Sequence, residues 1–121
     1  MTNPFRDQAK FMTACGQSVS EINNAQYAMY LDLIDEEREE LKEAIVASDR
    51  VEQLDALIDI LVVTVGAIHS GGFDAEAAWN EVMKTNFAKV DPETGLVRKR
   101  EDGKVLKPEG WTAPELSPFV K

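Results

Sequence analysis

Apolar residues recur at helical spacing in four stretches of the chain. The first stretch runs from Pro4 to about Ala14, where Asn3 followed by proline suits a helix start and Gly16 suits an end. The second and longest stretch covers about residues 24–47. Its apolar residues form one stripe of a helix, made of Tyr27, Tyr30, Leu31, Ile34, Leu41 and Ile45.

The third stretch, from about Arg50 to His69, is apolar on all sides. Asp59 is the only charged residue between Ala56 and Ile68. This pattern is typical of a buried, central helix, where a lone carboxylate is costly unless a cation meets it. We therefore expect a central helix that carries one functional acid.

The fourth stretch runs from about Ala75 to Lys89, behind Asp74 as a capping residue. Its predicted inner face consists of Ala78, Trp79, Val82, Met83 and Phe87. Short links between all four stretches favour antiparallel neighbours. The breaks fall at Ser48-Asp49, which ends one helix and caps the next, and at Gly71-Gly72.

From Pro92 onward, prolines, glycines and turn sequences replace the helical pattern, with one small hairpin predicted over residues 96–106. We expect an all-α fold, an antiparallel bundle of about four helices with an irregular C-terminal tail. Residues 1–90 would form the helical domain. Residues 91–121 would form the tail, packed on the same domain or on a partner subunit.

Composition and charge narrow the classes of function. The 121 residues carry a net charge of −9, from 22 acidic and 13 basic residues, which argues against binding to a nucleic-acid polymer or an anionic membrane. A single cysteine, Cys15, excludes an intramolecular disulfide and a cysteine-based zinc site. The sequence shows no basic-then-apolar leader and no apolar run long enough to span a bilayer. We therefore expect a cytoplasmic protein without membrane contact.

Acidic residues interrupt the apolar pattern on two helices. Glu37 occupies a position where the stripe of residues 24–47 calls for an apolar residue, and Glu40 lies beside it at i+3. On the third stretch, acids recur along one narrow stripe: Glu52, Asp55 and Asp59. Antiparallel packing would let Glu37 and Glu40 meet Asp55 and Asp59. One or two Mg²⁺ ions, with Mn²⁺ as a substitute, would relieve the repulsion among these carboxylates. The alternatives are a solvated acidic face and a buried Asp59–Arg38 ion pair.

More than half of the Lys and Arg residues lie in the last third of the chain: Lys84, Lys89, Arg98, Lys99, Arg100, Lys104 and Lys107. A basic region in so acidic a chain suits a polyphosphate that reaches both a metal site and these cations. The alternative is a tail that neutralises its own acidic body. Trp111, within this region, is interpreted as a docking anchor, with a stacking surface as the second reading.

Four segments together resemble the all-α nucleoside triphosphate pyrophosphohydrolases, which include MazG, dimeric dUTPases and phosphoribosyl-ATP pyrophosphohydrolase. Residues 34–41 resemble the E-E-x-x-E element of that superfamily, and residues 57–66 its second acidic helix. Residues 81–89 resemble the segment whose Asn and Lys hold the nucleotide, and residues 102–111 the tail of small MazG-like members. The resemblance covers about residues 25–112.

The resemblance implies Mg²⁺-dependent hydrolysis of a nucleoside or deoxynucleoside triphosphate to the monophosphate and pyrophosphate. Glu37, Glu40 and Asp59 would be metal ligands, and Glu36 or Glu37 would activate the attacking water. The usual second motif is E-x-x-D, but Ala56 stands at its glutamate position. Asp55, Glu52 or neither therefore completes the site.

The resemblance also implies a substrate-binding set and an assembly. The phosphates or the base would be held by Lys84, Asn86, Lys89, Lys104 and Lys107. Small MazG-like members form homodimers or homotetramers, and we expect the same here. Two other functions stay open. One is a non-catalytic acidic helical module with a structural ion, and the other is a phosphoribosyl-ATP-type pyrophosphohydrolase.

Overall fold

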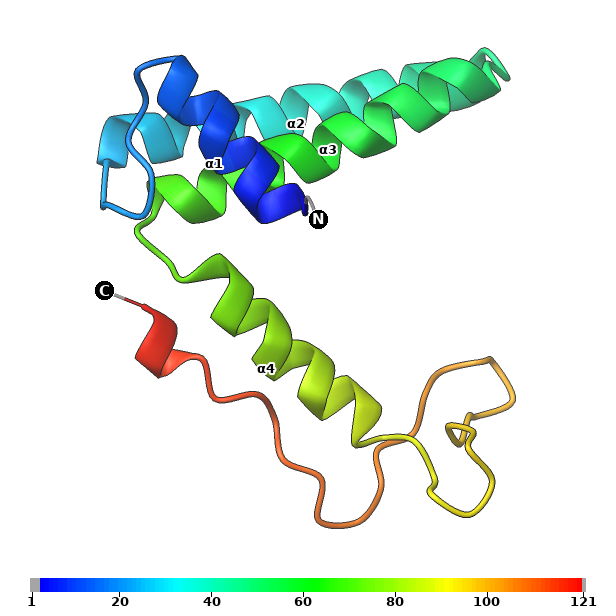
Figure 1. Cartoon of the computed structure of the whole chain (residues 1–121). Coiled ribbons are helices and arrows are strands. Elements are labelled where there is room, and N and C mark those ends of the chain that lie inside the picture. The colour runs from blue at the N-terminus through cyan, green and yellow to red at the C-terminus, as the bar shows by residue number, and fades with distance from the viewer. Residues whose placement is uncertain (1–2, 121) are drawn as a thin grey trace. The chain divides into compact units, whose positions relative to one another are not determined.

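Four α-helices account for the regular structure of residues 3–120, the part of the chain that this computed structural model describes. The helices are α1 (Pro4–Ala14), α2 (Asn24–Val46), α3 (Arg50–Ser70) and α4 (Ala75–Phe87), followed by the 3-10 turn η1 (Ser117–Phe119) (Figure 1). Residues 3–120 contain isolated β-bridges but no β-strand. The predicted all-α fold is confirmed, and each helix lies within two residues of its predicted bounds.

Local capping explains why the first three helices begin where they do. In each case the side chain before the helix accepts a hydrogen bond from the backbone N–H three residues later, as seen at Asn3, Asn23 and Asp49. Ser48, just before the third cap, has φ of 54°. This left-handed conformation ends α2 and lets the chain turn directly into α3.

The chain forms two compact units. The first consists of residues 3–75 together with Val120 and holds α1, α2 and α3. The second, Glu76–Phe119, holds nearly all of α4 and the tail. The predicted helical domain over residues 1–90 stays a prediction, since α4 shares its compact unit with the tail.

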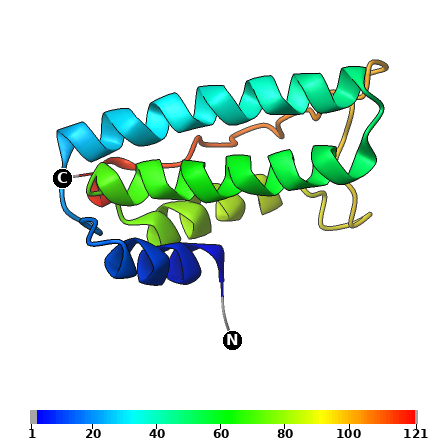
Figure 2. The same cartoon turned by 90° about the horizontal axis from the view of Figure 1, so that it is seen from above.

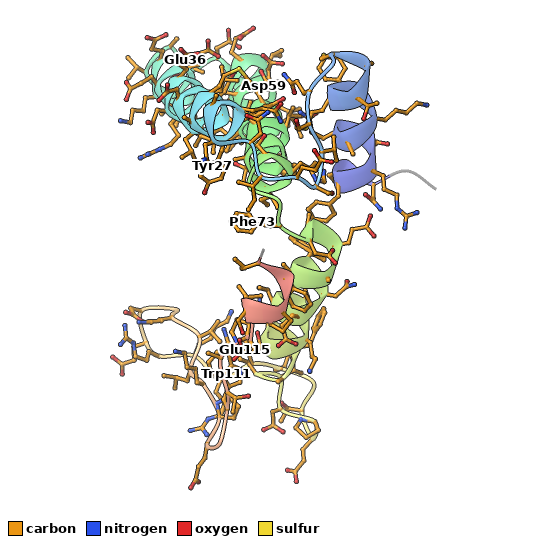
Figure 3. All side chains as sticks on the ribbon, turned by 90° about the vertical axis from the view of Figure 1, so that its left-hand side faces the viewer. Tyr27, Glu36, Asp59, Phe73, Trp111 and Glu115 are labelled. Carbon is orange, nitrogen blue, oxygen red and sulfur yellow. The ribbon has the colours of Figure 1, made fainter. Side chains whose placement is uncertain are left out.

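In the first unit, α2 and α3 lie antiparallel along their length, and α1 packs on α3 (Figure 2). Met12, Tyr30, Val63 and Ala67 form the buried core cluster. Gly66 allows this packing, because a Cβ atom there would lie 2.3 Å from the Tyr30 ring. At the end of α3, Phe73 meets Tyr27 edge-on, with ring centroids 6.3 Å apart (Figure 3).

The prediction that α3 is buried on all sides is wrong within the first unit. Its apolar side chains Leu54, Leu57, Ile58 and Leu61 are each 50% or more exposed. The reason is that only α1 and α2 pack on α3 within its unit, which leaves one apolar side uncovered. Trp79 and Phe87, predicted on the inner face of α4, are likewise exposed. Within residues 3–120, no helix is both long and apolar enough to cross a membrane.

In the second unit, the tail returns alongside α4 and is tied to it at two points. The indole Nε1–H of Trp111 donates to the Thr85 carbonyl at 2.7 Å. The Glu115 backbone N–H donates to Glu81 Oε2 at 3.0 Å. Trp111 and Glu115 both lie beside α4 in Figure 3. The tail is therefore a returning strap within its own unit.

The predicted hairpin over residues 96–106 is reduced to a single turn. A bridge joins Lys99 and Val105, and the Arg100 N–H donates to the Lys104 carbonyl at 2.8 Å. Gly103 turns the chain with φ of 88°. So few backbone pairs form no strand, because an isolated hairpin without a packed face is marginally stable in water.

Candidate functional site

Four carboxylates from the two paired helices form what we call the acidic cluster: Glu37 and Glu40 of α2, and Asp55 and Asp59 of α3. The charges of the other three all act on Glu37. Asp59 in turn is affected by Asp55 and Glu40. The antiparallel packing of α2 and α3 thus brings together the acids that the sequence places on their shared side.

Glu37 is the most perturbed member of the acidic cluster. Burial raises the pKa of its carboxyl first, and a hydrogen bond with Glu40 and the charges of Glu40, Asp59 and Asp55 raise it further, from 4.5 to about 7. Its Oε2 atom is buried and has no hydrogen-bond partner. Burial, followed by the charges of Asp55 and Glu40, also raises the pKa of Asp59. Burial and the neighbouring negative charges thus both disfavour the ionised forms of Glu37 and Asp59.

No basic side chain compensates the acidic cluster within residues 3–120. Arg38 pairs with Asp35 at 3.7 Å on the exposed side of α2, and Lys42 pairs with Glu39 at 3.0 Å. The Asp59–Arg38 ion pair considered as an alternative is therefore not formed. The cations of α2 face solvent, while its partly buried Glu37 faces other acids.

The two remaining acids of the prediction lie outside the acidic cluster. Glu36 is exposed and is not among the groups that perturb Glu37. Glu52 lines a cavity of about 400 Å³ between α2 and α3 together with Glu40 and Asp55. The charge of Asp55 acts on both Glu37 and Asp59, whereas Glu52 is not among the groups that act on either. Which acid completes the site stays a prediction.

The donor set fits a hard divalent cation. Carboxylate oxygens are the ligands that Mg²⁺ and Mn²⁺ prefer, and the unpaired Oε2 of Glu37 offers one such oxygen. Within residues 3–120, no three acidic, histidine or cysteine side chains already surround one position where an ion could sit. The carboxylates of the acidic cluster would therefore have to converge further to ligate an ion.

The predicted substrate-binding residues all belong to the second unit. Two of the lysines lie at the Trp111 ring, and the others have different surroundings. Lys84 is paired with Glu81 at 3.3 Å, and Lys104 is exposed. Lys89 donates to Asn86 Oδ1 at 3.2 Å. The ammonium groups of Lys89 and Lys107 each lie 5.0 Å from the centroid of one ring, that of Trp111.

Trp111, interpreted from the sequence as a docking anchor or a stacking surface, lies within cation–π distance of two of the predicted substrate-binding lysines. Its indole Nε1–H donates to the Thr85 carbonyl near the end of α4. The folded chain also places the ammonium groups of two lysines near the same ring.

An all-α fold with acids paired across two antiparallel helices defines the class of MazG-like pyrophosphohydrolase domains. The sequence model of the phosphoribosyl-ATP pyrophosphohydrolase family matches residues 10–86. Because this match spans more than half of the chain, the protein belongs to that family. The match includes the whole acidic cluster and ends at Asn86, so Lys89, Lys107 and Trp111 lie beyond it.

No curated protein matches the chain. The suspected superfamily is nevertheless confirmed by the family match, and the chain carries the domain of a pyrophosphohydrolase.

Proposed function

We propose that the protein is a Mg²⁺-dependent enzyme that hydrolyses a nucleoside or deoxynucleoside triphosphate to the monophosphate and pyrophosphate. The observation that carries this proposal is the acidic cluster. The charges of Glu40, Asp55 and Asp59 all act on Glu37 and raise its pKa to about 7, and within residues 3–120 none of the four carboxylates has a basic partner. Acids held in this way are typical of catalytic and metal sites.

The acidic cluster is the proposed holder of the cation, with Mn²⁺ as a substitute for Mg²⁺. Glu37, Glu40, Asp55 and Asp59 would supply the oxygens. When bound, the ion stabilises the negative charge that develops on phosphate oxygens. Its positive charge also offsets the mutual repulsion that raises the pKa of Glu37 and Asp59.

Glu36 and Glu37 are the two candidates for the residue that orients or deprotonates the attacking water. The water oxygen forms a bond to phosphorus at the α–β anhydride, and the anhydride P–O bond breaks to release pyrophosphate. The proton of the water passes to the carboxylate. A base works best when its pKa lies near the working pH, which favours Glu37 with its pKa of about 7.

The proposed substrate-binding residues are Lys84, Asn86, Lys89, Lys104 and Lys107. Lysine holds phosphate as a point charge without a fixed geometry. Lys84 would have to exchange its partner Glu81 for a phosphate, whereas the ammonium of Lys107 has no carboxylate partner within residues 3–120. Lys107 could therefore bind a phosphate without first breaking an ion pair, whereas Lys84 could not.

A second substrate class is phosphoribosyl-ATP, which carries the same kind of anhydride. The family model that matches residues 10–86 favours it. A panel of substrates that differ in base and sugar distinguishes the two classes.

The experiment is an assay of pyrophosphate release from each canonical and deoxynucleoside triphosphate and from phosphoribosyl-ATP, in Mg²⁺ or Mn²⁺. We expect metal-dependent release that Glu37→Gln abolishes and Glu39→Gln preserves, since Glu39 is paired with Lys42 on the exposed side of α2. No release from any substrate in either metal would contradict the proposal. Loss of thermal stability or assembly in Glu37→Gln, without any turnover in the wild type, would indicate a structural ion instead.

We further propose that the protein is a homodimer or homotetramer that covers the open side of α3. A groove of about 450 Å³ there is lined mainly by apolar side chains, among them Phe11, Ile58, Leu61 and Val62. Exposed apolar side chains gathered on one face of a protein often mark an interface. Leu61→Glu should shift the protein to monomers in sedimentation velocity, because a charge would then enter the shared face. A wild-type monomer at high concentration would overturn this assembly.

A further inference from the structure

The contact between Tyr30 of α2 and Gly66 of α3 lies two helical turns from the acidic cluster. Glu37 follows Tyr30 by seven residues, and Asp59 precedes Gly66 by seven. Because the two helices are antiparallel, both steps lead in the same direction along the pair (Figure 2), over about 10 Å. Seven residues are close to two whole turns, so each acid lies on the same side of its helix as the contact residue. The contact and the two acids therefore share one interhelical face.

The Tyr30–Gly66 contact leaves no room for a side chain at position 66. A Cβ atom there would lie 2.3 Å from Tyr30 Cε1 and 2.5 Å from Cδ1, whereas ordinary contact begins at 3.4 Å. The ring is held in place, because Tyr30 is 5% exposed and its hydroxyl donates to Gln17 Oε1 at 2.6 Å. Protein interiors are close-packed, so an added methyl group would push α2 and α3 apart.

The helices are also joined on the far side of the acidic cluster. Gln53 Nε2 of α3 donates to the Ala44 carbonyl of α2 at 3.4 Å. Glu37 lies seven residues from both Tyr30 and Ala44, midway between the two contacts. A separation forced at Gly66 would therefore reach the level of Glu37 at roughly half its size.

The acidic cluster has little tolerance for such a separation. Within residues 3–120, no three acidic, histidine or cysteine side chains already surround one position, so the carboxylates must converge to hold an ion. Mg²⁺ requires oxygens in near-ideal geometry at about 2.1 Å, and ligand sets lose function when displaced by more than about 0.5 Å. Any added distance between α2 and α3 opposes this convergence.

We propose that Gly66 and Tyr30 are positioning residues of the acidic cluster. The Tyr30 ring, seated on the backbone of Gly66, fixes the separation of α2 and α3 at which Glu37 and Asp59 can share one divalent cation. This role rests on the metal function proposed above. It makes glycine at position 66 a requirement of ion binding as well as of packing.

The test is Mn²⁺ titration of the full chain, with the free ion measured by electron paramagnetic resonance. Gly66→Ala should weaken binding at least about tenfold, because the ligand oxygens no longer converge. The matched control is Met12→Ala. Met12 is fully buried in the same core cluster but belongs to α1, so its truncation leaves a cavity and adds no atom between α2 and α3. This control should lower the melting temperature at least as much and change the Mn²⁺ affinity less than about twofold.

Two variants at position 30 test the contact from the other helix. Tyr30→Leu added to Gly66→Ala removes the ring that the new Cβ meets, so the double variant should recover most of the lost affinity. Tyr30→Trp enlarges the ring against Gly66 and should weaken Mn²⁺ binding as Gly66→Ala does. It replaces Gly66→Ala if that protein does not fold. Circular dichroism at the titration temperature checks the fold of each variant.

Three results would overturn the positioning role and leave the metal site standing: unchanged affinity in Gly66→Ala, an equal loss in Met12→Ala, or no recovery in the double variant. A wild type that binds no Mn²⁺ would overturn the metal role and this inference with it. Because the titration needs no turnover, a lack of pyrophosphate release would leave its outcome unaffected.

Discussion

Removing the charge of Glu37 should stabilise the metal-free protein although it abolishes the proposed activity. Glu37→Gln keeps the size of the side chain and removes one member of four mutually repelling carboxylates. The difference between a pKa of about 7 and the ordinary 4.5 corresponds to about 3.4 kcal/mol. Glu37 is only partly buried, so water screens much of this energy, and we expect a net gain of about 1 kcal/mol.

The gain should depend on pH in a defined direction. Glu37 has a higher pKa in the folded chain than its ordinary value of 4.5. The stability that its proton provides is therefore fully present below about pH 4.5 and is lost as the pH rises through about 7. At pH 8 the wild type carries the repelling charge and the variant does not. At pH 5 the folded wild type is mostly neutral at this position, so the difference should be clearly smaller than at pH 8.

The assay is urea unfolding in EDTA at pH 5 and pH 8. Glu39→Gln is the control, because Glu39 forms an exposed pair with Lys42 and should change stability by less than about 0.5 kcal/mol at either pH. A Glu37→Gln protein that is less stable than wild type at pH 8, or that differs equally at both pH values, would refute the reasoning.

Three further predictions concern the rest of the chain. Mg²⁺ should raise the melting temperature of the wild type but not of Asp59→Asn, and the rise should shrink below pH 7 because protons compete with the ion for the acidic cluster. Gly66→Ala should lower the free energy of unfolding by about 1–3 kcal/mol, since the new Cβ would lie 2.3 Å from the Tyr30 ring; an unchanged urea midpoint would contradict this. Glu81→Gln should speed hydrogen exchange at the Glu115 amide, because that amide donates to the Glu81 carboxylate; equal exchange rates would mean that this contact does not hold the tail.

Helix boundaries could be predicted because they depend on neighbouring residues. Asn3 and Asp49 cap helices through hydrogen bonds to amides three residues away, and such contacts are visible as sequence patterns. Glu37 could be identified because it interrupts an apolar stripe, and the structure brings it against acids of α3.

The cover of α3 and the contacts of Trp111 could not be predicted from the sequence, because they depend on which parts of the folded chain pack together. The apolar pattern of α3 indicates burial but does not identify the covering surface, and within the first unit α1 and α2 cover only part of this helix. The lysines at positions 89 and 107 are 18 positions apart in sequence, and only the return of the tail along α4 brings both onto Trp111. Lys84 differs from them because it pairs with Glu81, a contact that depends on the folded structure.

Binding of Mn²⁺, followed by the electron paramagnetic resonance signal of the free ion, tests the metal role of the acidic cluster most directly. We predict saturable binding to the wild type and to Glu39→Gln, and a loss of at least tenfold in affinity in Glu37→Gln. Equal Mn²⁺ affinity in the wild type and Glu37→Gln would contradict the account, whatever the activity of either protein.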